Sequence, residues 1–178
     1  MDFEVLRIGQ RLVRDDRVTT HVALVARAFG ASKIYMNEVD PEIKDTLNKI
    51  NATWGGNFEI EFITDWKKIV KEKKVNSKKI IHLTMYGENI NDVASSLQKE
   101  ENILIVVGAE KVPREVYDLA DYNVAVGHQP HSEISALAVL LDRIQNGKQL
   151  LTRFENPSRE IIPTKNGKKV IMNKTMDK

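Results

Sequence analysis

Three predicted strands each end in glycine close to polar residues. The segments are Leu83–Gly87, Val107–Pro113 and Val126–Glu133. In an open α/β sheet, ligands bind beyond the carboxyl ends of the strands, where glycine lets the backbone approach a ligand closely. A single glycine after a strand is usually only a turn. Three such strand ends together predict one shared binding pocket.

The residues around this pocket limit the class of its ligand. The chain has neither the Gly-x-Gly-x-x-Gly signature of dinucleotide-binding enzymes nor the phosphate-binding P-loop. These absences disfavour a dehydrogenase and an NTPase. A ligand held by the backbone of several loops, without a phosphate cradle, suits an adenosyl compound that carries no phosphate, such as S-adenosylmethionine.

Two histidines in the last of these loops, His128 and His131, have a spacing that superficially resembles a metal site. Pro130 interrupts the pair, and the other histidines, His21 and His82, lie far away in the sequence. The chain also has no cysteine. We therefore predict no metal, expect His21 and His82 to be structural, and expect the loop to form hydrogen bonds around a cofactor.

The length and composition indicate one folded unit. A chain of 178 residues with 42% hydrophobic composition is long enough for a single core with a short appendage. We expect a catalytic domain at residues 1–150 and a basic C-terminal extension at residues 151–178. Because the sequence has no long apolar run, no apolar leader and no cysteine, we expect a cytoplasmic protein without a membrane span.

Positive charge is concentrated in two places. Residues 148–178 hold eight Lys and Arg residues against three acidic ones, although the net charge of the whole chain is only +2. The second concentration is a series of arginines in the N-terminal part: Arg7, Arg11, Arg14, Arg17 and Arg27. Both can contact a phosphate backbone, which makes RNA a candidate partner. The alternative for the C-terminal segment is an ordinary solvated tail.

The elements that must position the pocket alternate along the chain. Short β-branched runs predict strands at Val5–Gly9, Lys33–Met36, Phe58–Thr64, Lys79–Thr84, Ile103–Val107 and Tyr122–Val126. The stretches between them predict helices at Thr19–Phe29, Pro41–Trp54, Asp65–Lys73, Ile90–Gln98, Arg114–Leu119 and Ser132–Gln145. This alternation is typical of an α/β fold with a mostly parallel sheet and helices on both faces.

Local signals add detail to this outline. Ile103–Val107 is continuously apolar, as a strand covered on both faces should be, so we place it at the centre of the sheet. Thr19 or Thr20 is expected to cap the first helix. Asn166 and Gly167 lie between two apolar pairs and predict a hairpin in the C-terminal extension.

The helix predicted at Ser132–Gln145 is apolar on two faces. One face is formed by Ile134, Leu137, Ala138 and Leu141, and the other by Ala136, Leu140 and Ile144. A helix with two apolar faces is buried on two sides. In a chain this short, we predict that one side faces its own core and the other a partner subunit in a homodimer. The alternative is a helix fully internal to one subunit.

Several segments resemble the sequence motifs of the SPOUT class of RNA methyltransferases. The first, second and third motifs correspond to Thr19–Gly30, Ile105–Pro113 and Asn123–Ala138. Within this class, the chain is most similar to the archaeal tRNA (cytidine-56) 2′-O-methyltransferase family, in the segments Leu6–Arg11, Arg14–His21 and Gly127–Glu133. The resemblance covers roughly residues 3–147.

The resemblance implies a fold and an activity that the sequence pattern alone does not give. The C-terminal part of the sheet would be tied into a trefoil knot, an exception to the rule against threading, and the active site would form at the interface of a homodimer. The activity would be S-adenosylmethionine-dependent 2′-O-methylation of T-loop cytidine 56 in archaeal tRNA. The cofactor would contact Leu83, Gly108, Ala109, Glu110, Lys111, Val112, Val126, Gly127, His128, Gln129, Pro130, His131, Ser132 and Glu133.

The resemblance also implies a catalytic arginine. Many SPOUT ribose methyltransferases carry it six residues before the glycine that ends the first-motif helix, and here that position is Leu24. We therefore expect Arg17 to take the role, followed by Arg14 and Arg27. The positive charge would stabilise the negative charge that develops on the ribose 2′-oxygen.

Three alternatives remain open from the sequence. The protein could be a SPOUT ribose methyltransferase that modifies another tRNA or rRNA nucleotide, which a methylation map of native tRNA would decide. It could be a cofactor-free RNA-binding module, which a titration with S-adenosylmethionine would test. The last alternative, another α/β enzyme with a nucleotide cofactor, is disfavoured by the missing glycine-rich signatures.

Overall fold

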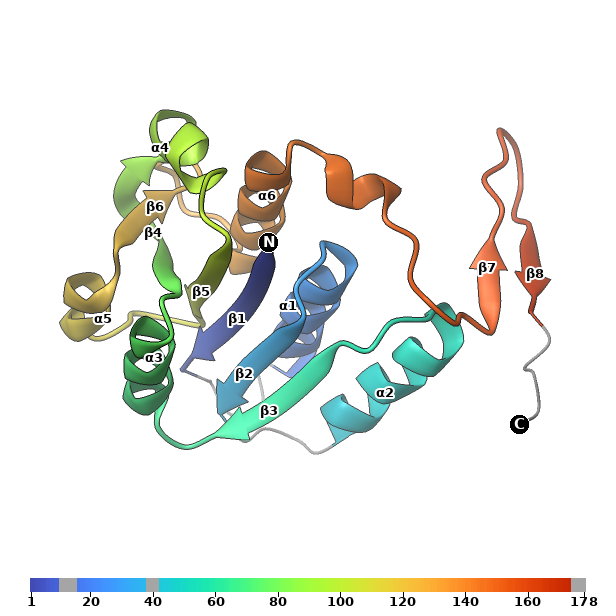
Figure 1. The fold of residues 1–178 in the computed structure, drawn as a ribbon, viewed down its shortest axis with the longest axis horizontal. Helices are drawn as coiled ribbons and strands as arrows, with labels where there is room; N and C mark the ends of the chain where they lie inside the picture. The colour runs from blue at the N-terminus through green and yellow to red at the C-terminus, as the bar shows by residue number, and fades with distance from the viewer. Residues whose placement is uncertain (10–15, 38–41, 174–178) are drawn as a thin grey trace.

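Six strands form one parallel sheet in the computed structural model, which describes residues 1–9, 16–37 and 42–173. The strands are β1 (Asp2–Ile8), β2 (Lys33–Asn37), β3 (Glu59–Ile63), β4 (Lys79–Asn89), β5 (Asn102–Gly108) and β6 (Tyr122–Ala125). Their order across the sheet is β3-β2-β1-β5-β4-β6 (Figure 1). The predicted central position of Ile103–Val107 is confirmed, because β5 lies between β1 and β4.

Helices cover both faces of the sheet, as the alternating pattern predicts. They are α1 (Asp16–Ala28), α2 (Glu42–Trp54), α3 (Trp66–Val75), α4 (Ile90–Leu97), α5 (Arg114–Leu119) and α6 (Glu133–Gln145). The buried side chains of α1, α2, α4 and α6 share one hydrophobic cluster with the sheet, and those of α3 and α5 share another. The predicted α/β class with a parallel sheet is therefore confirmed.

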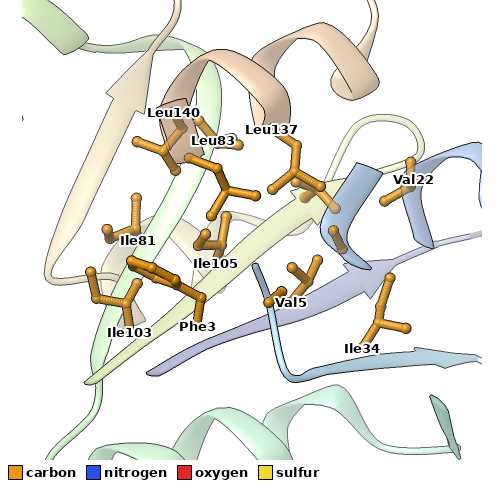
Figure 2. Packing of buried hydrophobic residues seen from close by; sticks show 14 of the residues in the cluster. Phe3, Val5, Val22, Ile34, Ile81, Leu83, Ile103, Ile105, Leu137 and Leu140 are labelled. Atoms are coloured by element: carbon orange, nitrogen blue, oxygen red, sulfur yellow. The ribbon is translucent and has the colours of Figure 1, made fainter. Parts of the chain in front are cut away.

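The two clusters follow from the alternation of side chains along each strand. On β1, Phe3 and Val5 belong to the larger cluster, whereas Leu6 and Ile8 belong to the smaller one. Figure 2 shows the larger cluster, in which Val5 and side chains of β5 pack beneath Leu137 and other residues of α6. Strands buried on both faces need apolar residues at nearly every position. This explains the unbroken apolar run of β5.

The strand β4 contains an irregularity that matters for the pocket. Both Leu83 and Glu88 pair with Val124 of β6, so residues 84–87 lie outside the regular ladder. Sequence reasoning ended this strand at Thr84, but β4 resumes after the bulge and continues to Asn89. Bulges of this kind often lie next to active sites, where they redirect side chains.

The beginning of α1 differs from the prediction. Neither Thr19 nor Thr20 caps the helix, because α1 already includes Asp16. Thr19 lies inside the first turn, is completely buried, and its hydroxyl accepts a hydrogen bond from the guanidinium of Arg7 on β1. The threonine thus connects the helix to the sheet instead of starting the helix.

The helix α6 is buried on both apolar faces within one chain. Ala136, Leu140 and Ile144 of the second face are as buried as Leu137 and Leu141 of the first. α6 packs against α1, α4, β4 and β5. The alternative of an internal helix therefore accounts for the two-faced pattern, and that pattern no longer argues for a homodimer.

After α6 the chain forms a 3₁₀ turn at Lys148–Leu151, and the C-terminal extension contains an antiparallel hairpin of β7 (Arg159–Ile161) and β8 (Val170–Met172), which confirms the predicted hairpin. Figure 1 shows this hairpin set off from the sheet, near the end of α2. The connecting segment is anchored by Phe154, whose ring lies 4.6 Å from the guanidinium carbon of Arg27. No helix in the described ranges is long and apolar enough to span a membrane.

Candidate active site

The three glycine-bearing strand ends meet at one edge of the sheet and enclose a cavity of about 680 Å³. Its walls come from the ends of β4 and β5, the segment after β6 and the first turns of α5 and α6. Part of the lining is apolar and includes Leu83, Val107, Val124 and Ala136. Cavities of this size are typical of small-molecule sites.

Hydrogen bonds connect these segments to one another and to the sheet. Ala109 N donates to the carbonyl of Ile8 at the end of β1, at 2.9 Å. His128 Nδ1 lies 3.0 Å from the carbonyl of Met85 in the β4 bulge, and His131 Nε2 lies 2.6 Å from the carbonyl of Val126. These contacts position the cavity edge, as the preorganisation of a binding site requires.

Nearly all of the residues expected to contact a cofactor line the cavity. These are Leu83, Gly108, Ala109, Glu110, Lys111, Val112, Val126, Gln129, Pro130, His131, Ser132 and Glu133. The exceptions are Gly127 and His128. Gly127 has a backbone φ of +71°, which glycine adopts without strain, and His128 holds the β4 bulge.

Close packing explains two of the glycines at the cavity. A Cβ at Gly87 would lie 2.6 Å from Val124 N and closer still to the carbonyl of Asn123. A Cβ at Gly108 would instead collide with the side chain of Val112. Gly87 therefore lets β6 approach the bulge, and Gly108 lets the following loop fold back over the end of β5.

A polar network that sequence reasoning did not assign forms another wall of the cavity. His82 Nδ1 lies 2.9 Å from Asn123 Oδ1, and the amide nitrogen of Asn123 donates to the carbonyl of Tyr117 at 3.1 Å. Tyr117 in turn shares a 3.0 Å hydrogen bond with the hydroxyl of Thr84. The rings of His82 and Tyr117 pack edge to face. His82 was expected to be structural, and it is buried, but it also lines the cavity.

The network fixes the tautomer of His82. Because the Asn123 amide donates to Tyr117, its oxygen faces His82, and Nδ1 of the ring must be the donor. Burial lowers the pKa of His82 below its ordinary value of 6.5, and the hydrogen bond to Asn123 opposes this only in part. The ring is therefore neutral at neutral pH.

The depressed pKa of His82 predicts that the protein becomes less stable in mild acid. The unfolded chain takes up a proton on this ring near pH 6.5, and the folded chain does so only at lower pH. The free energy of unfolding should thus fall as the pH is lowered through about 6.5. Urea denaturation between about pH 7.5 and about pH 5.5 should show this loss in the wild type and a flatter profile in His82→Gln. Parallel profiles would contradict the assignment.

Arg7 is a buried cation that connects the sheet to the edge of the cavity. Only 2% of its surface is exposed. The guanidinium donates to Thr19 on α1 and lies 3.4 Å from Glu133 Oε1 at the start of α6. Sequence reasoning counted Arg7 in a cationic patch that contacts RNA. Because Arg7 is buried within the chain, direct contact with an RNA phosphate is ruled out.

The three candidate catalytic arginines differ in where they lie. Arg17 lies in the first turn of α1, exposed and outside the set of residues that line the cavity. Arg14 lies outside the described residues. Arg27 is buried, and it binds Asn51 Oδ1 at 2.8 Å and the carbonyl of Gly55 at 2.5 Å.

The environment of Arg27 corrects its place in the prediction. Burial lowers the pKa of its guanidinium, and the group packs on Phe154 of the C-terminal extension. These partners lie toward the opposite end of α1 from Arg17 and Thr19. The structure therefore gives Arg27 an anchoring role, away from the cavity. His21, expected to be structural, is exposed on α1.

The lining residues suit an adenosyl sulfonium. Its adenine and its methionine carbon chain can pack on the apolar walls, while the carboxylates of Glu110 and Glu133 compensate for positive charge. Within the described ranges, no group of three or more His, Asp or Glu side chains is arranged to hold a metal ion.

The fold is also found in solved structures of RNA methyltransferases. The A. aeolicus TrmH/SpoU tRNA modifying enzyme matches 84% of this chain and 76% of its own, with a TM-score of 0.61 and 14% identity. The SpoU methyltransferase AviRb from Streptomyces viridochromogenes, solved with the cofactor AdoMet, matches 85% of this chain and 58% of its own, with a TM-score of 0.58 and 10% identity. The chain thus has the fold of the SpoU methyltransferases, which belong to the SPOUT class.

Sequence comparison gives the family within this class. The chain belongs to the family described as tRNA ribose 2'-O-methyltransferase, aTrm56, whose profile matches residues 54–171. The tRNA (cytidine(56)-2'-O)-methyltransferase of Nitrosopumilus maritimus is 70% identical over 99% of this chain and 100% of the relative. The enzyme of the same name from Methanocaldococcus jannaschii is 49% identical over 98% of each chain.

Proposed function

We propose that this protein transfers a methyl group from S-adenosylmethionine to the ribose 2′-hydroxyl of cytidine 56 in tRNA. The observation that carries this proposal is the 70% identity, over essentially the full length of both chains, to a relative named for that reaction. The cavity agrees with it, because the segments that line it include the family-like loops at Gly108–Val112 and Val126–Glu133.

The proposed cofactor is supported by the cavity walls and by a structural neighbour that was solved with AdoMet. When bound, S-adenosylmethionine supplies an electrophilic methyl group and leaves as a neutral thioether, so the site needs no acid for the leaving group. The site must instead activate the nucleophile. A ribose hydroxyl is a weak nucleophile at neutral pH, and its oxygen must be aligned and its developing charge stabilised.

Arg17 remains our first choice for this stabilising charge. It precedes by two residues Thr19, which Arg7 holds against the sheet, so the first turn of α1 has a fixed position relative to Glu133. An arginine is too basic to be a comfortable proton acceptor. Its proposed role is therefore electrostatic, and a phosphate or water accepts the proton.

Replacing Arg17 with alanine should lower kcat on tRNA by roughly 10²- to 10³-fold, the range found when one charge-stabilising donor is removed. The affinity for S-adenosylmethionine should change little, because Arg17 does not line the cavity. Arg17→Lys, which keeps the charge, should recover part of the loss. Steady-state kinetics with calorimetry of cofactor binding measures both quantities, and an unchanged kcat in Arg17→Ala would eliminate this residue.

Three finer proposals follow from the family resemblance. We propose a homodimer with the active site at its interface, a trefoil knot in the C-terminal part of the sheet, and a division into a catalytic domain at 1–150 and a basic extension at 151–178. The exposed cationic side chains of the extension, including Arg153 and Arg159, support a contact with tRNA phosphates. A flatter salt dependence of tRNA affinity after deletion of residues 152–178 would support that contact.

The proposed reaction is tested by incubating the protein with radiolabelled S-adenosylmethionine and an unmodified tRNA transcript. The label should appear only at the 2′-oxygen of cytidine 56, and a transcript that carries 2′-deoxycytidine there should remain unlabelled. Label at another nucleotide would favour the alternative ribose methyltransferase. No binding of S-adenosylmethionine would favour the RNA-binding module.

A further inference from the structure

Tyr86 is a feature of the cavity that the proposed chemistry leaves unused. It lines the cavity, yet 78% of its surface is exposed. The other large apolar side chains that are exposed in the described ranges are Met1, Val75 and residues from Leu150 onward, none of them aromatic. An exposed aromatic ring that lines a cavity is suited to stack against a flat partner.

The backbone that carries Tyr86 is held firmly. Tyr86 lies near the tip of the four-residue bulge in β4, outside the ladder with β6. The bulge is fixed by His128, which bonds the carbonyl of Met85 at 3.0 Å, and by Gly87, which lies against the backbone of Asn123. The amide of Tyr86 itself donates to Thr84 Oγ1 at 3.4 Å. The backbone position of Tyr86 is therefore set by the same contacts that build the cavity.

We propose that Tyr86 is a stacking platform for the nucleobase of the nucleotide whose ribose enters the cavity. This inference rests on the proposed function, which makes RNA the substrate. To reach a ribose inside folded tRNA, the nucleotide must leave its stack, and an unstacked base is commonly received by an aromatic side chain. A tyrosine ring offers a large flat face at a small cost in side-chain entropy.

Positive charge at the cavity agrees with a nucleotide as its partner. Lys111 and Arg114 line the same cavity and are exposed. These side chains can receive the phosphates on either side of the extruded nucleotide. A base on Tyr86, a ribose above the cavity and phosphates at the two cations would together account for the exposed groups at this edge.

The experiment compares four substitutions at Tyr86 by their dissociation constants for tRNA and for S-adenosylmethionine. Tyr86→Ala and Tyr86→Leu should weaken tRNA binding roughly five- to a hundredfold, the range for loss of one base–aromatic stack. Tyr86→Phe and Tyr86→Trp should bind tRNA nearly as the wild type does, because each keeps a flat ring. Because Tyr86 also lines the cavity, Tyr86→Ala and Tyr86→Leu should lower cofactor affinity by a much smaller factor than tRNA affinity, which is measured at saturating cofactor. Val75→Ala removes an exposed apolar side chain outside the cavity lining and should have no effect.

A tRNA that lacks the base at position 56 identifies the partner of the ring. On this abasic tRNA, Tyr86→Ala and the wild type should bind equally, since the stacking partner is gone. An equal penalty on intact and abasic tRNA would overturn the proposal, and so would a loss of cofactor affinity as large as the loss of tRNA affinity, or a change of oligomeric state, in Tyr86→Ala. Failure of the wild type to methylate tRNA would instead count against the proposed function. The stacking proposal would still be tested, because binding to intact and abasic tRNA can be compared without methylation.

Discussion

Methylation of tRNA by Arg7→Met is expected to be slower than by the wild type by about two orders of magnitude, although Arg7 does not line the cavity. The buried guanidinium connects β1, Thr19 of α1 and Glu133 at the start of α6. Without the guanidinium, the first turns of α1 and α6 lose the side chain that connects both of them to β1. Misplacement of about 1 Å at a reacting centre is enough for a hundredfold loss.

Arg7→Met should lose stability but remain folded. Removing one partner of a fully buried ion pair costs about 3–5 kcal/mol, because the other charge is left buried without compensation. The carboxylate left behind, Glu133, is 23% exposed and keeps access to water. Among the described residues, Arg7 Nε also has no hydrogen-bond partner, and an unsatisfied buried donor is itself a cost to the wild type.

The matched control for Arg7 is Arg143→Met, the same chemical change at an exposed position of α6. It should leave both kcat and the unfolding midpoint near their wild-type values. Arg7→Lys should recover only part of the activity, because one ammonium group does not span Thr19 and Glu133 as the planar guanidinium does. If Arg7→Met kept the wild-type kcat, the positioning role would be wrong.

The second large effect is expected for Gly87→Ala, which should lose several kcal/mol of stability and most of its cofactor affinity. The new Cβ would collide with the backbone of Asn123 and with Val124 N. Backbone atoms have no rotamer by which to move away, so β6 must shift away from β4. That shift opens one wall of the cavity.

Gly108 provides a sharp comparison for Gly87. A Cβ at Gly108 meets chiefly the side chain of Val112, so the second substitution Val112→Ala should restore much of the stability lost in Gly108→Ala. No single side-chain truncation should rescue Gly87→Ala. Gly127→Ala meets no atom within 4 Å and suffers only from its positive φ, at a cost of about 1 kcal/mol. Urea denaturation and cofactor titration of these variants check the ranking, and a Gly87→Ala as stable as Gly127→Ala would contradict it.

The location of the cavity was predictable from the sequence because it follows from topology. Parallel strands place their carboxyl ends at one edge, so glycines after β5 and β6 had to lie near each other once the strands were recognised. The apolar run of β5 identified the centre of the sheet. Such arguments need only strand positions and directions.

The residues that sequence reasoning missed depend on which face of a strand a helix covers. Arg7 is the clearest case, because its odd position on β1 places it under α1 and α6 with Phe3 and Val5. The sequence alone suggested an exposed cation. His82 was similarly read as a structural residue in an apolar strand, because nothing in the sequence places Tyr117 and Asn123 beside it.

The bulge that presents Tyr86 was also beyond sequence reasoning. Sequence reasoning ended β4 at Thr84, whereas the strand resumes its pairing with β6 after four residues. Burial of both faces of α6 in one chain shows a further limit. Two apolar faces require two neighbours, but the sequence does not say whether these belong to the same subunit.

The central claim is that the strand ends at Leu83–Gly87, Gly108–Val112 and Val126–Glu133 enclose S-adenosylmethionine. The most direct measurement is a crystal structure of the protein soaked with this cofactor. We predict that the adenosyl group lies between the three segments, with its methyl group directed toward the mouth of the cavity. A cofactor bound elsewhere, or a cavity that stays filled by its own side chains at saturating ligand, would contradict the account.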